Sequence, residues 1–323
     1  MSKESPTRIP EPIFEKSRNI AFAIRKKLNW TFLGQLFEIR ANLRPDFPVL
    51  TFENGPHPEV VQTFQDLHEN SHRFARALLD AGLEKGDKYA AIMHNYPEMI
   101  HLMAAASITG SIVVPIDPRT KGRKLAHMIS NSKSKAVFIT ADLLENIEPI
   151  IEEIPDVKHI FTVEKPGRPS TGDISNFKSM QEILEAPFRP VNYMLSNPAH
   201  PIQIVYTSGT TGDPKGVLNE NFRFPIYGYI LSRYWKYDRS DTIYTGLSLT
   251  HGNAQGCTFA PAVYRSIKAV FSVKFTKSRL WDITRKYGAT TFSMLGGVAS
   301  GIYNEPPKPD DSDNPVRHVV SAG

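Results

Sequence analysis

The chain has 323 residues, of which 41% are hydrophobic and 22% charged; this is the composition of a soluble globular protein, with length enough for two packed α/β units or one large domain. Its 38 basic and 33 acidic residues give a net charge of +5, which favours anionic ligands, but no dense basic run lies among aromatic residues, so nucleic-acid binding gains little support. Cys257 is the only cysteine, which excludes an intramolecular disulfide and favours a reducing compartment.

Two stretches bear on localisation. Residues 1–18 are polar and charged and lack the apolar core of a signal peptide. Residues 99–116 are uncharged over a length that could suggest a membrane span, but a histidine, a glycine and a proline interrupt them. Helix formers fill 99–106 and β-branched residues are frequent in 111–116. We therefore predict a helix, a turn and a buried strand here, and a cytoplasmic protein without a membrane span.

Strands and helices alternate along the chain. An extended arm leads into helical patterning over 13–43, and Thr63 is placed to cap a helix that stops at Gly82. The expected strands are 48–53, 89–93, 111–116, 136–139, 202–206, 242–247, 268–273 and 316–323, and the further expected helices are 99–106, 123–130, 221–234 and 278–287. This alternation predicts a mostly parallel, doubly wound α/β architecture.

The chain is expected to divide into three parts. An N-terminal arm with helices would occupy 1–45, and a first α/β subdomain would occupy 46–200. Residues 164–173 are rich in proline, glycine and serine and would form a loop on the approach to a second α/β subdomain over 201–323.

The most informative stretch is residues 206–217, with the sequence YTSGTTGDPKGV, which directly follows an apolar strand. Its glycines, Gly209 and Gly212 among them, allow the backbone N–H groups to point inward and form a nest for an anion. Four hydroxyl groups, from Thr207, Ser208, Thr210 and Thr211, add further donors, and Lys215 adds a full positive charge. This combination indicates a polyphosphate site.

The spacing excludes a Walker A loop, because no Gly-Lys-Ser/Thr follows four residues after a glycine. An ordinary polar surface loop is the alternative interpretation. The stretch resembles the phosphate-binding signature of the adenylate-forming enzymes, which are the AMP-forming acyl- and aryl-CoA synthetases, adenylation domains and luciferases. Residues 82–87, Asn95 and 110–118 also resemble the first subdomain of this family. Asp87 and Asn95 themselves are expected to be a turn carboxylate and a loop amide beside strand ends.

The resemblance implies an acid-binding pocket next to the phosphate loop. In the family a short motif ending in histidine or another aromatic residue lines this pocket, and His251 matches its last position. The pattern departs at Ser248 and Thr250, where the family has a proline and an aromatic residue, so a hydrogen-bonded structural histidine is the alternative. The small helix start after His251 would leave room for an acyl group or allow a tight helix–sheet contact. The residues assigned to the pocket are His251, Gly252, Gln255, Gly296 and Gly297, with Gly296 standing where a proline is usual.

The last residues, Ser321, Ala322 and Gly323, resemble the start of the family's adenine pocket. The family continues beyond this point with further nucleotide contacts and a small C-terminal domain that bears a catalytic lysine. We therefore expect the chain to be the front part of such an enzyme, truncated before the C-terminal domain and a poor catalyst alone.

The resemblance implies an acid:CoA ligase that uses ATP, Mg²⁺ and CoA, with a carboxylic acid, a small molecule whose identity stays open, as the other substrate. Loop 207–216 would hold the leaving phosphates, and Lys215 and His251 would act in catalysis; no side chain is assigned to a metal. Within the family, residues 251–255 and 281–291 look most like the carnitine/crotonobetaine-CoA ligases and the short- to medium-chain acid ligases. The alternative is a non-catalytic nucleotide-binding or protein-interaction module derived from such a ligase. A dinucleotide-dependent oxidoreductase is disfavoured, because no Gly-x-Gly-x-x-Gly follows an early strand.

Overall fold

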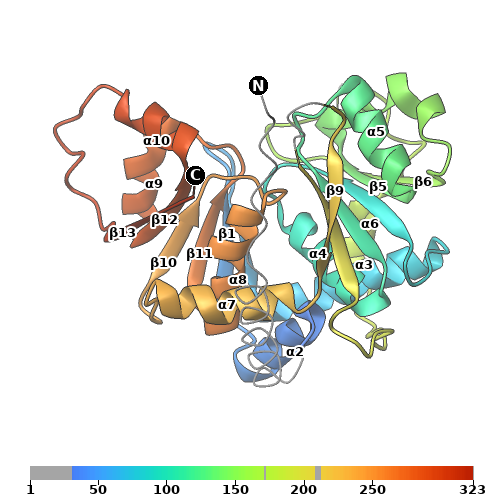
Figure 1. The fold of residues 1–323 in the computed structure, drawn as a ribbon, viewed down its shortest axis with the longest axis horizontal. Coiled ribbons are helices and arrows are strands. Elements are labelled where there is room, and N and C mark those ends of the chain that lie inside the picture. Colours follow the sequence, from blue (N-terminus) through green and yellow to red (C-terminus); the bar gives the residue numbers. More distant parts are fainter. Residues whose placement is uncertain (1–30, 171, 208–211, 323) are drawn as a thin grey trace, which may run out of the picture.

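The computed structural model describes residues 31–170, 172–207 and 212–322, which form two β-sheets lying side by side with helices around and between them (Figure 1). The seven-stranded sheet has the order β7 (Lys178–Ser179), β6 (His159–Val163), β5 (Ser134–Thr140), β3 (Lys88–Ile92), β4 (Ile112–Ile116), β8 (Pro201–Thr207) and β9 (Lys215–Glu220). The six-stranded sheet has the order β13 (His318–Ala322), β12 (Thr291–Leu295), β10 (Thr242–Thr245), β11 (Lys268–Ser272), β1 (Pro48–Glu53) and β2 (Val60–Thr63).

All strand pairs within the two sheets are parallel except β1–β2 and β8–β9, so the predicted α/β class with two mostly parallel sheets is confirmed. The strands are not divided between the sheets at residue 200, however. β8 and β9 complete the first sheet, whereas β1 and β2 join the second sheet through a parallel pairing of β1 with β11. Pairing between distant segments cannot be read from local patterns, which explains the difference from the expected division.

The helices fill the connections between strands. They are α2 (Leu33–Leu43), α3 (Phe64–Asp80), α4 (Pro97–Thr109), α5 (Gly122–Ser132), α6 (Met180–Glu185), α7 (Arg223–Tyr234), α8 (Ala260–Arg265), α9 (Leu280–Tyr287) and α10 (Gly296–Tyr303). The predicted cap of α3 is present, because Thr63 Oγ1 accepts from the backbone N–H of Asp66 and the Asp66 carboxylate accepts from the N–H of Thr63. Gly82 follows the helix with a φ of +75°, the left-handed conformation that favours glycine.

Helix α4 explains the uncharged stretch that could have suggested a membrane span. All of its residues are buried, and it ends at Gly110, whose φ of +74° turns the chain into β4. The largest core cluster joins α4 to α2, α3, β1 and β11, so α4 packs in the interior between the sheets (Figure 1). Within the described ranges, every helix is too short or too polar to cross a lipid bilayer.

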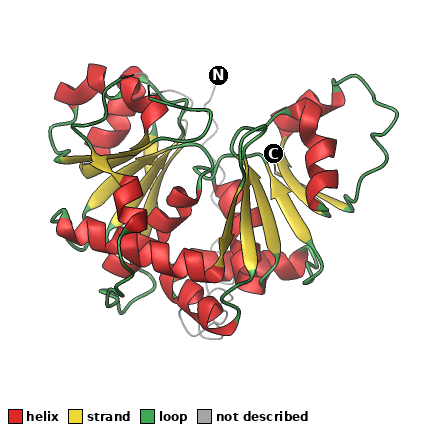
Figure 2. Ribbon diagram, turned by 180° about the vertical axis from the view of Figure 1, so that it is seen from behind, coloured by secondary structure: helices red, strands yellow, loops and turns green. Residues whose placement is uncertain are grey.

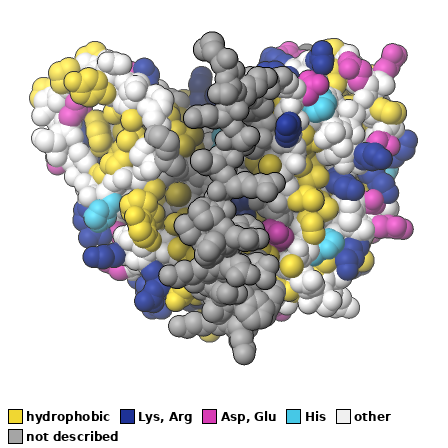
Figure 3. All heavy atoms as spheres, viewed as in Figure 1, with side chains coloured by type: hydrophobic (Ala, Val, Ile, Leu, Met, Phe, Trp, Pro, Cys, Tyr) yellow, Lys and Arg dark blue, Asp and Glu magenta, His cyan; other side chains and the backbone are white. Residues whose placement is uncertain are grey.

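Each sheet and the helices packed on it form one lobe of the molecule. Figure 2 shows the two lobes from behind, with the loops that follow their strands meeting between them. Because both sheets are mostly parallel, these are largely loops at the carboxyl ends of strands, where open α/β sheets bind ligands. On the face seen in Figure 3, lysine and arginine side chains are interspersed with acidic ones over the seven-stranded lobe, whereas hydrophobic side chains gather at the outer side of the six-stranded lobe. Tyr303, at the end of α10, is 89% exposed.

Three histidines make the stability of the fold depend on pH. Burial is the main cause that lowers the pKa of His72, His94 and His101, each to about 4. Hydrogen bonds keep two of them neutral, since His72 Nδ1 accepts from the N–H of Val191 and His94 Nε2 accepts from Arg168. An unfolded histidine titrates near pH 6.5, so between about pH 6.5 and 4 the unfolded chain binds more protons than the folded one.

The free energy of unfolding is therefore expected to fall as the pH drops from 6.5 to 4, with unfolding taking up roughly three protons near pH 5, and the contribution of these histidines is expected to level off below that range. Urea titrations at several pH values measure this slope. His101→Gln keeps a donor for Gln62 while removing one titrating group, so it should reduce the slope by about one proton. A stability that does not change between pH 6.5 and 4.5 would contradict the assignment.

Candidate functional site

A cavity of about 830 Å³ lies where the carboxyl ends of β4, β8 and β10 meet. Its walls come from three segments that are far apart in the sequence: 115–128, which spans the end of β4 and the start of α5, then 205–214, which includes the described parts of the predicted phosphate loop, and 250–252. Apolar side chains (Pro115, Ile116, Met128 and Val205) share the lining with cationic ones (Arg119, Lys121 and Lys124). The cavity therefore has the size and the mixed lining of a small-molecule site.

A hairpin fixes both ends of the phosphate loop. Thr207, the last residue of β8, pairs with Lys215, the first residue of β9, and Thr207 Oγ1 donates to the carbonyl of Lys215 at 3.4 Å. Gly216 follows in a position where a Cβ would approach Cγ2 of Ile204 to 2.7 Å, so only glycine fits without movement. The glycine and the lysine of the motif thus take part in a strand that the sequence did not predict.

Helix α5 contacts the C-terminal part of the loop, at Asp213 and Pro214. Arg123 pairs with Asp213 at 3.3 Å, and His127 Nε2 lies 3.1 Å from the carbonyl oxygen of Pro214, to which it donates as the Nε2–H tautomer. Farther along the helix, Asn131 accepts a hydrogen bond of 2.7 Å from the hydroxyl of Tyr206. These contacts connect both ends of the loop to helix α5.

Asp117 and His251 form the part of the wall that joins the two lobes. Asp117 follows β4 and accepts two hydrogen bonds from the guanidinium of Arg119, at 2.8 and 2.7 Å. Nε2 of His251, in the loop after β10, lies 3.5 Å from Oδ2 of Asp117, the same oxygen that accepts from Nη2 of Arg119. Burial alone would raise the pKa of Asp117, but the side chains of Arg119 and His251 outweigh burial and hold it well below its usual range. The carboxylate therefore stays ionised and orients the side chains of both neighbours.

Asn95 positions the loop that carries His251. Its side chain is 3% exposed and comes from the loop after β3 in the other sheet. The amide nitrogen donates to the carbonyls of Leu247 and Ser272, both at 2.9 Å, and the amide oxygen accepts from the N–H of Leu249 at 2.8 Å. Three hydrogen bonds from one side chain thus hold the ends of β10 and β11 against the seven-stranded sheet.

Replacing Asp117 with asparagine is expected to lower the free energy of unfolding by about 1 kcal/mol at pH 7, since Arg119 is largely exposed and the lost charge is partly screened. The folded-state pKa of Asp117 is depressed, so its contribution is present above the unfolded pKa of about 4 and decreases as the pH falls below it. Urea titrations of both proteins at pH 7 and pH 3 measure the effect. The difference should shrink at pH 3, and an equal or larger difference there would contradict it.

The predicted site residues are placed in three groups. Thr207, Gly212, His251 and Gly252 line the cavity, and Lys215 is exposed at the start of β9 beside it. Gln255 is buried in a π-helical turn (Ala254–Phe259) and donates to the carbonyl of Leu249, so it supports the loop that bears His251. Gly296 and Gly297 begin α10, and Ser321 and Ala322 end β13; among the described residues that line the cavity, none of these four is present. Ser208, Gly209, Thr210, Thr211 and Gly323 lie outside the described residues.

Sequence reasoning did not assign roles to Arg119, Lys121 and Lys124 or to the carboxylate of Asp117. Their position in the sequence could have indicated a binding role, because these residues directly follow a buried strand of a parallel sheet, at the edge where ligands bind. The predicted structural roles of Asp87 and Asn95 are confirmed. Asp87 accepts from the N–H of Glu84 and from Lys135, as a turn carboxylate does.

Comparison with known proteins agrees with this geometry. Residues 37–323 match the family model described as AMP-binding enzyme. Among curated relatives, long-chain fatty acid transport protein 6 of Mus musculus is 26% identical over 264 residues, covering 81% of this chain and 42% of the relative. Crotonobetaine/carnitine–CoA ligase of Salmonella typhimurium is 25% identical over 291 residues, covering 89% of this chain and 55% of the relative. The chain thus spans about half the length of these relatives.

Solved structures share the fold. The anthranilate CoA ligase AuaEII, in complex with anthranoyl-AMP, aligns with a TM-score of 0.80 at 17% identity, covering 90% of this chain and 55% of that chain. A protein from Rhodopseudomonas palustris described as a putative long-chain fatty acid CoA ligase aligns with a TM-score of 0.76 at 19% identity, covering 91% of this chain and 70% of that chain. The family match extends over nearly the whole chain and includes the segments that build the cavity. The chain belongs to the AMP-binding enzyme family.

Proposed function

We propose that the protein containing this chain activates a carboxylic acid with ATP, forming an acyl-AMP, and then transfers the acyl group to the thiol of CoA. One observation carries the proposal: in a chain of the AMP-binding enzyme family, described residues of the motif predicted to bind polyphosphate line an 830 Å³ cavity that His251 also lines. A cavity of this size accommodates a nucleotide together with a small acid.

In the first step, an oxygen of the substrate carboxylate forms a bond to the α-phosphorus of ATP, and the bond to the pyrophosphate breaks. Both reactants are anions, so the site must hold them together and neutralise the charge that develops on the leaving group. Lys215 and the loop 207–216 would take the leaving phosphates. Lys121 and Lys124 also line the cavity and would lower the cost of bringing two anions into it.

The second step breaks the bond between the acyl carbon and the AMP oxygen and forms a thioester bond to the sulfur of CoA, whose thiol proton is released. Mg²⁺ belongs to the proposal as the partner of the ATP phosphates. The described part of the chain holds no group of three or more His, Cys, Asp or Glu side chains placed to share a metal ion, so we assign no step to a protein-bound metal.

The acid would lie against the apolar part of the lining and near His251. Ile116, Met128 and Val205 provide this surface, and the half-exposed imidazole of His251 can donate to a carboxylate oxygen. The names of the relatives, which refer to fatty acids and to crotonobetaine and carnitine, define the first panel of acids to test.

Acid-dependent exchange between labelled pyrophosphate and ATP tests the first step, and mass spectrometry of acyl-CoA tests the second. The protein as its native cell makes it should catalyse both with at least one acid of the panel and neither without an acid. Tight ATP binding with no exchange for any fatty acid, crotonobetaine or carnitine would contradict the proposal and favour the non-catalytic nucleotide-binding module.

A further inference from the structure

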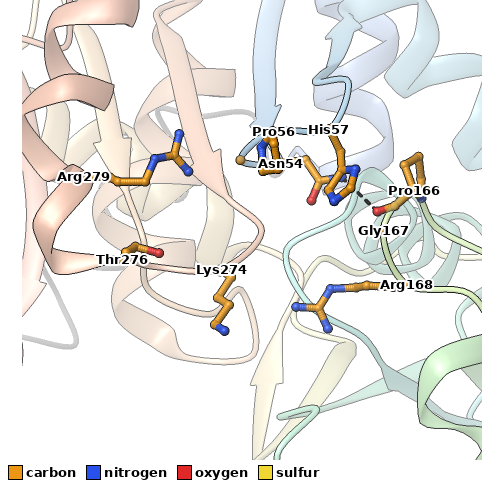
Figure 4. A pocket seen from close by; sticks show the side chains of 10 residues that line it. Asn54, Pro56, His57, Pro166, Gly167, Arg168, Lys274, Thr276 and Arg279 are labelled. Atoms are coloured by element: carbon orange, nitrogen blue, oxygen red, sulfur yellow. Dashed lines mark hydrogen bonds between the residues drawn. The ribbon is translucent and has the colours of Figure 1, made fainter.

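A second cavity, of about 420 Å³, lies between the two lobes and is distinct from the cavity at the phosphate loop. Three segments line it: 54–57 in the turn between β1 and β2, 166–168 after β6, and 274–279 between β11 and α9 (Figure 4). The first and third segments follow strands of the six-stranded sheet and the second follows a strand of the seven-stranded sheet, so both sheets contribute to the lining.

Direct contacts hold these segments together. The amide of Asn54 donates to the carbonyl of Pro166 at 3.4 Å, the interaction drawn as a dashed line in Figure 4. Gly167 has a φ of +74°, and a Cβ at this position would lie 2.1 Å from Nε2 of His57. A larger residue at position 167 would force the His57 side chain to move, so Gly167 lets these two segments contact each other at this wall of the cavity.

The cavity gathers cationic side chains from opposite sides. Arg168 extends into it from the seven-stranded side, and Lys274 and Arg279 lie on the six-stranded side (Figure 4). Lys274 has no hydrogen-bond or ion-pair partner among the residues that the structure describes, and its side chain is exposed. Thr276 adds a hydroxyl to the lining.

The carboxylates of Glu53 and Asp142 orient the guanidinium groups of Arg279 and Arg168. Nη2 of Arg279 donates to Glu53 at 3.0 Å, and this carboxylate is 3% exposed and also accepts from the hydroxyl of Ser272 at 2.8 Å. Nη1 of Arg168 donates to Asp142 at 3.1 Å. Each arginine uses some of its five donors in this way, and the remaining donors are available to a ligand in the cavity.

Two of the cations that line this cavity also act on the nearby His94. After burial, Arg168 is the largest cause that lowers the pKa of His94 to about 4, and Lys274 lowers it as well. Asp142 and Asp117 act in the opposite direction. Glu53 and Asp142 compensate the charges of Arg279 and Arg168, whereas Lys274 has no ion-pair partner among the described residues, so an anionic ligand in the cavity would gain this charge as a partner.

We propose that this cavity is a second anion site that binds the phosphate group of a small ligand. Donors contributed from both sides of the cavity can surround a tetrahedral dianion, whereas a planar carboxylate can be satisfied by a single arginine. Either inorganic phosphate or an organic phosphate monoester would present this group. The inference does not depend on the proposed function, because none of these cationic residues lines the cavity at the phosphate loop.

Calorimetric titration with inorganic phosphate and with ribose 5-phosphate tests the site, using a Lys215→Ala background so that the phosphate loop contributes less to the signal. Lys274→Gln should weaken binding of the preferred probe about tenfold, the loss expected for one charge-assisted contact. The matched control is Lys268→Gln, which removes the same charge from an exposed position at the opposite end of β11 and should leave the affinity unchanged.

Tighter binding of ribose 5-phosphate would identify an organic monoester as the ligand, and equal affinities would identify the free phosphate ion. Both results support the site when Lys274→Gln weakens binding and Lys268→Gln does not. Absence of binding by both probes, or equal losses in the two lysine variants, would overturn the proposal. Circular dichroism of each variant confirms that a loss does not come from unfolding.

Discussion

Replacing Asn95 with alanine is expected to lower the free energy of unfolding by about 3 kcal/mol. The substitution removes three hydrogen bonds at once and leaves the carbonyls of Leu247 and Ser272 and the N–H of Leu249 without their partner in a buried place. Because these groups lie at the carboxyl ends of β10 and β11, the loss also releases the loop that carries His251.

Urea unfolding at pH 7 measures this change. Asn146→Ala is the matched control, because Asn146 is also buried but makes a local hydrogen bond to the carbonyl of Leu143, and its removal should cost about 1 kcal/mol. In the complete protein, Asn95→Ala should also raise KM for the acid. Equal destabilisation by the two substitutions would mean that Asn95 does not hold the lobes together.

Replacing Lys215 with alanine is expected to reduce the rate of adenylate formation about 100-fold in the complete protein, the effect of removing one preorganised group that stabilises developing charge. The hairpin register fixes the lysine opposite Thr207 at the mouth of the loop. Its charge would therefore act on the leaving pyrophosphate more than on bound ATP. A larger effect on kcat than on KM for ATP is the expected signature.

Pyrophosphate release in a single-turnover assay measures this rate directly. Lys268→Ala provides a control, since it removes an equally exposed lysine from the other sheet, far from the loop in the fold. A Lys215→Ala protein that forms adenylate at the rate of the Lys268→Ala protein would remove Lys215 from the mechanism.

Local patterns were sufficient for much of the fold. The strand at Pro48–Glu53, the cap at Thr63 and the buried pair α4–β4 were predicted because apolar runs and capping residues act within a few positions. The strands β2, β6, β7 and β9 and the helix α6 were missed. β9 contains a glycine and an asparagine, which lower strand propensity, and its stability comes from pairing with β8.

The candidate site, like the fold, could be predicted only in part. The phosphate loop and His251 could be found from a contiguous motif and from a resemblance that preserves spacing. The contact of His251 with Asp117 joins residues from different sheets, as do the hydrogen bonds of Asn95. Such contacts depend on how two sheets pack, which short-range sequence patterns do not specify.

ATP is expected to bind in the cavity that is lined by the described ends of the phosphate loop and by Asp117 and His251. A crystal structure of the protein with ATP tests it most directly. We expect the triphosphate beside Thr207, Gly212 and Lys215, with the α-phosphate facing the part of the cavity that carries His251. Ordered ATP elsewhere on the molecule, with this cavity empty, would contradict it.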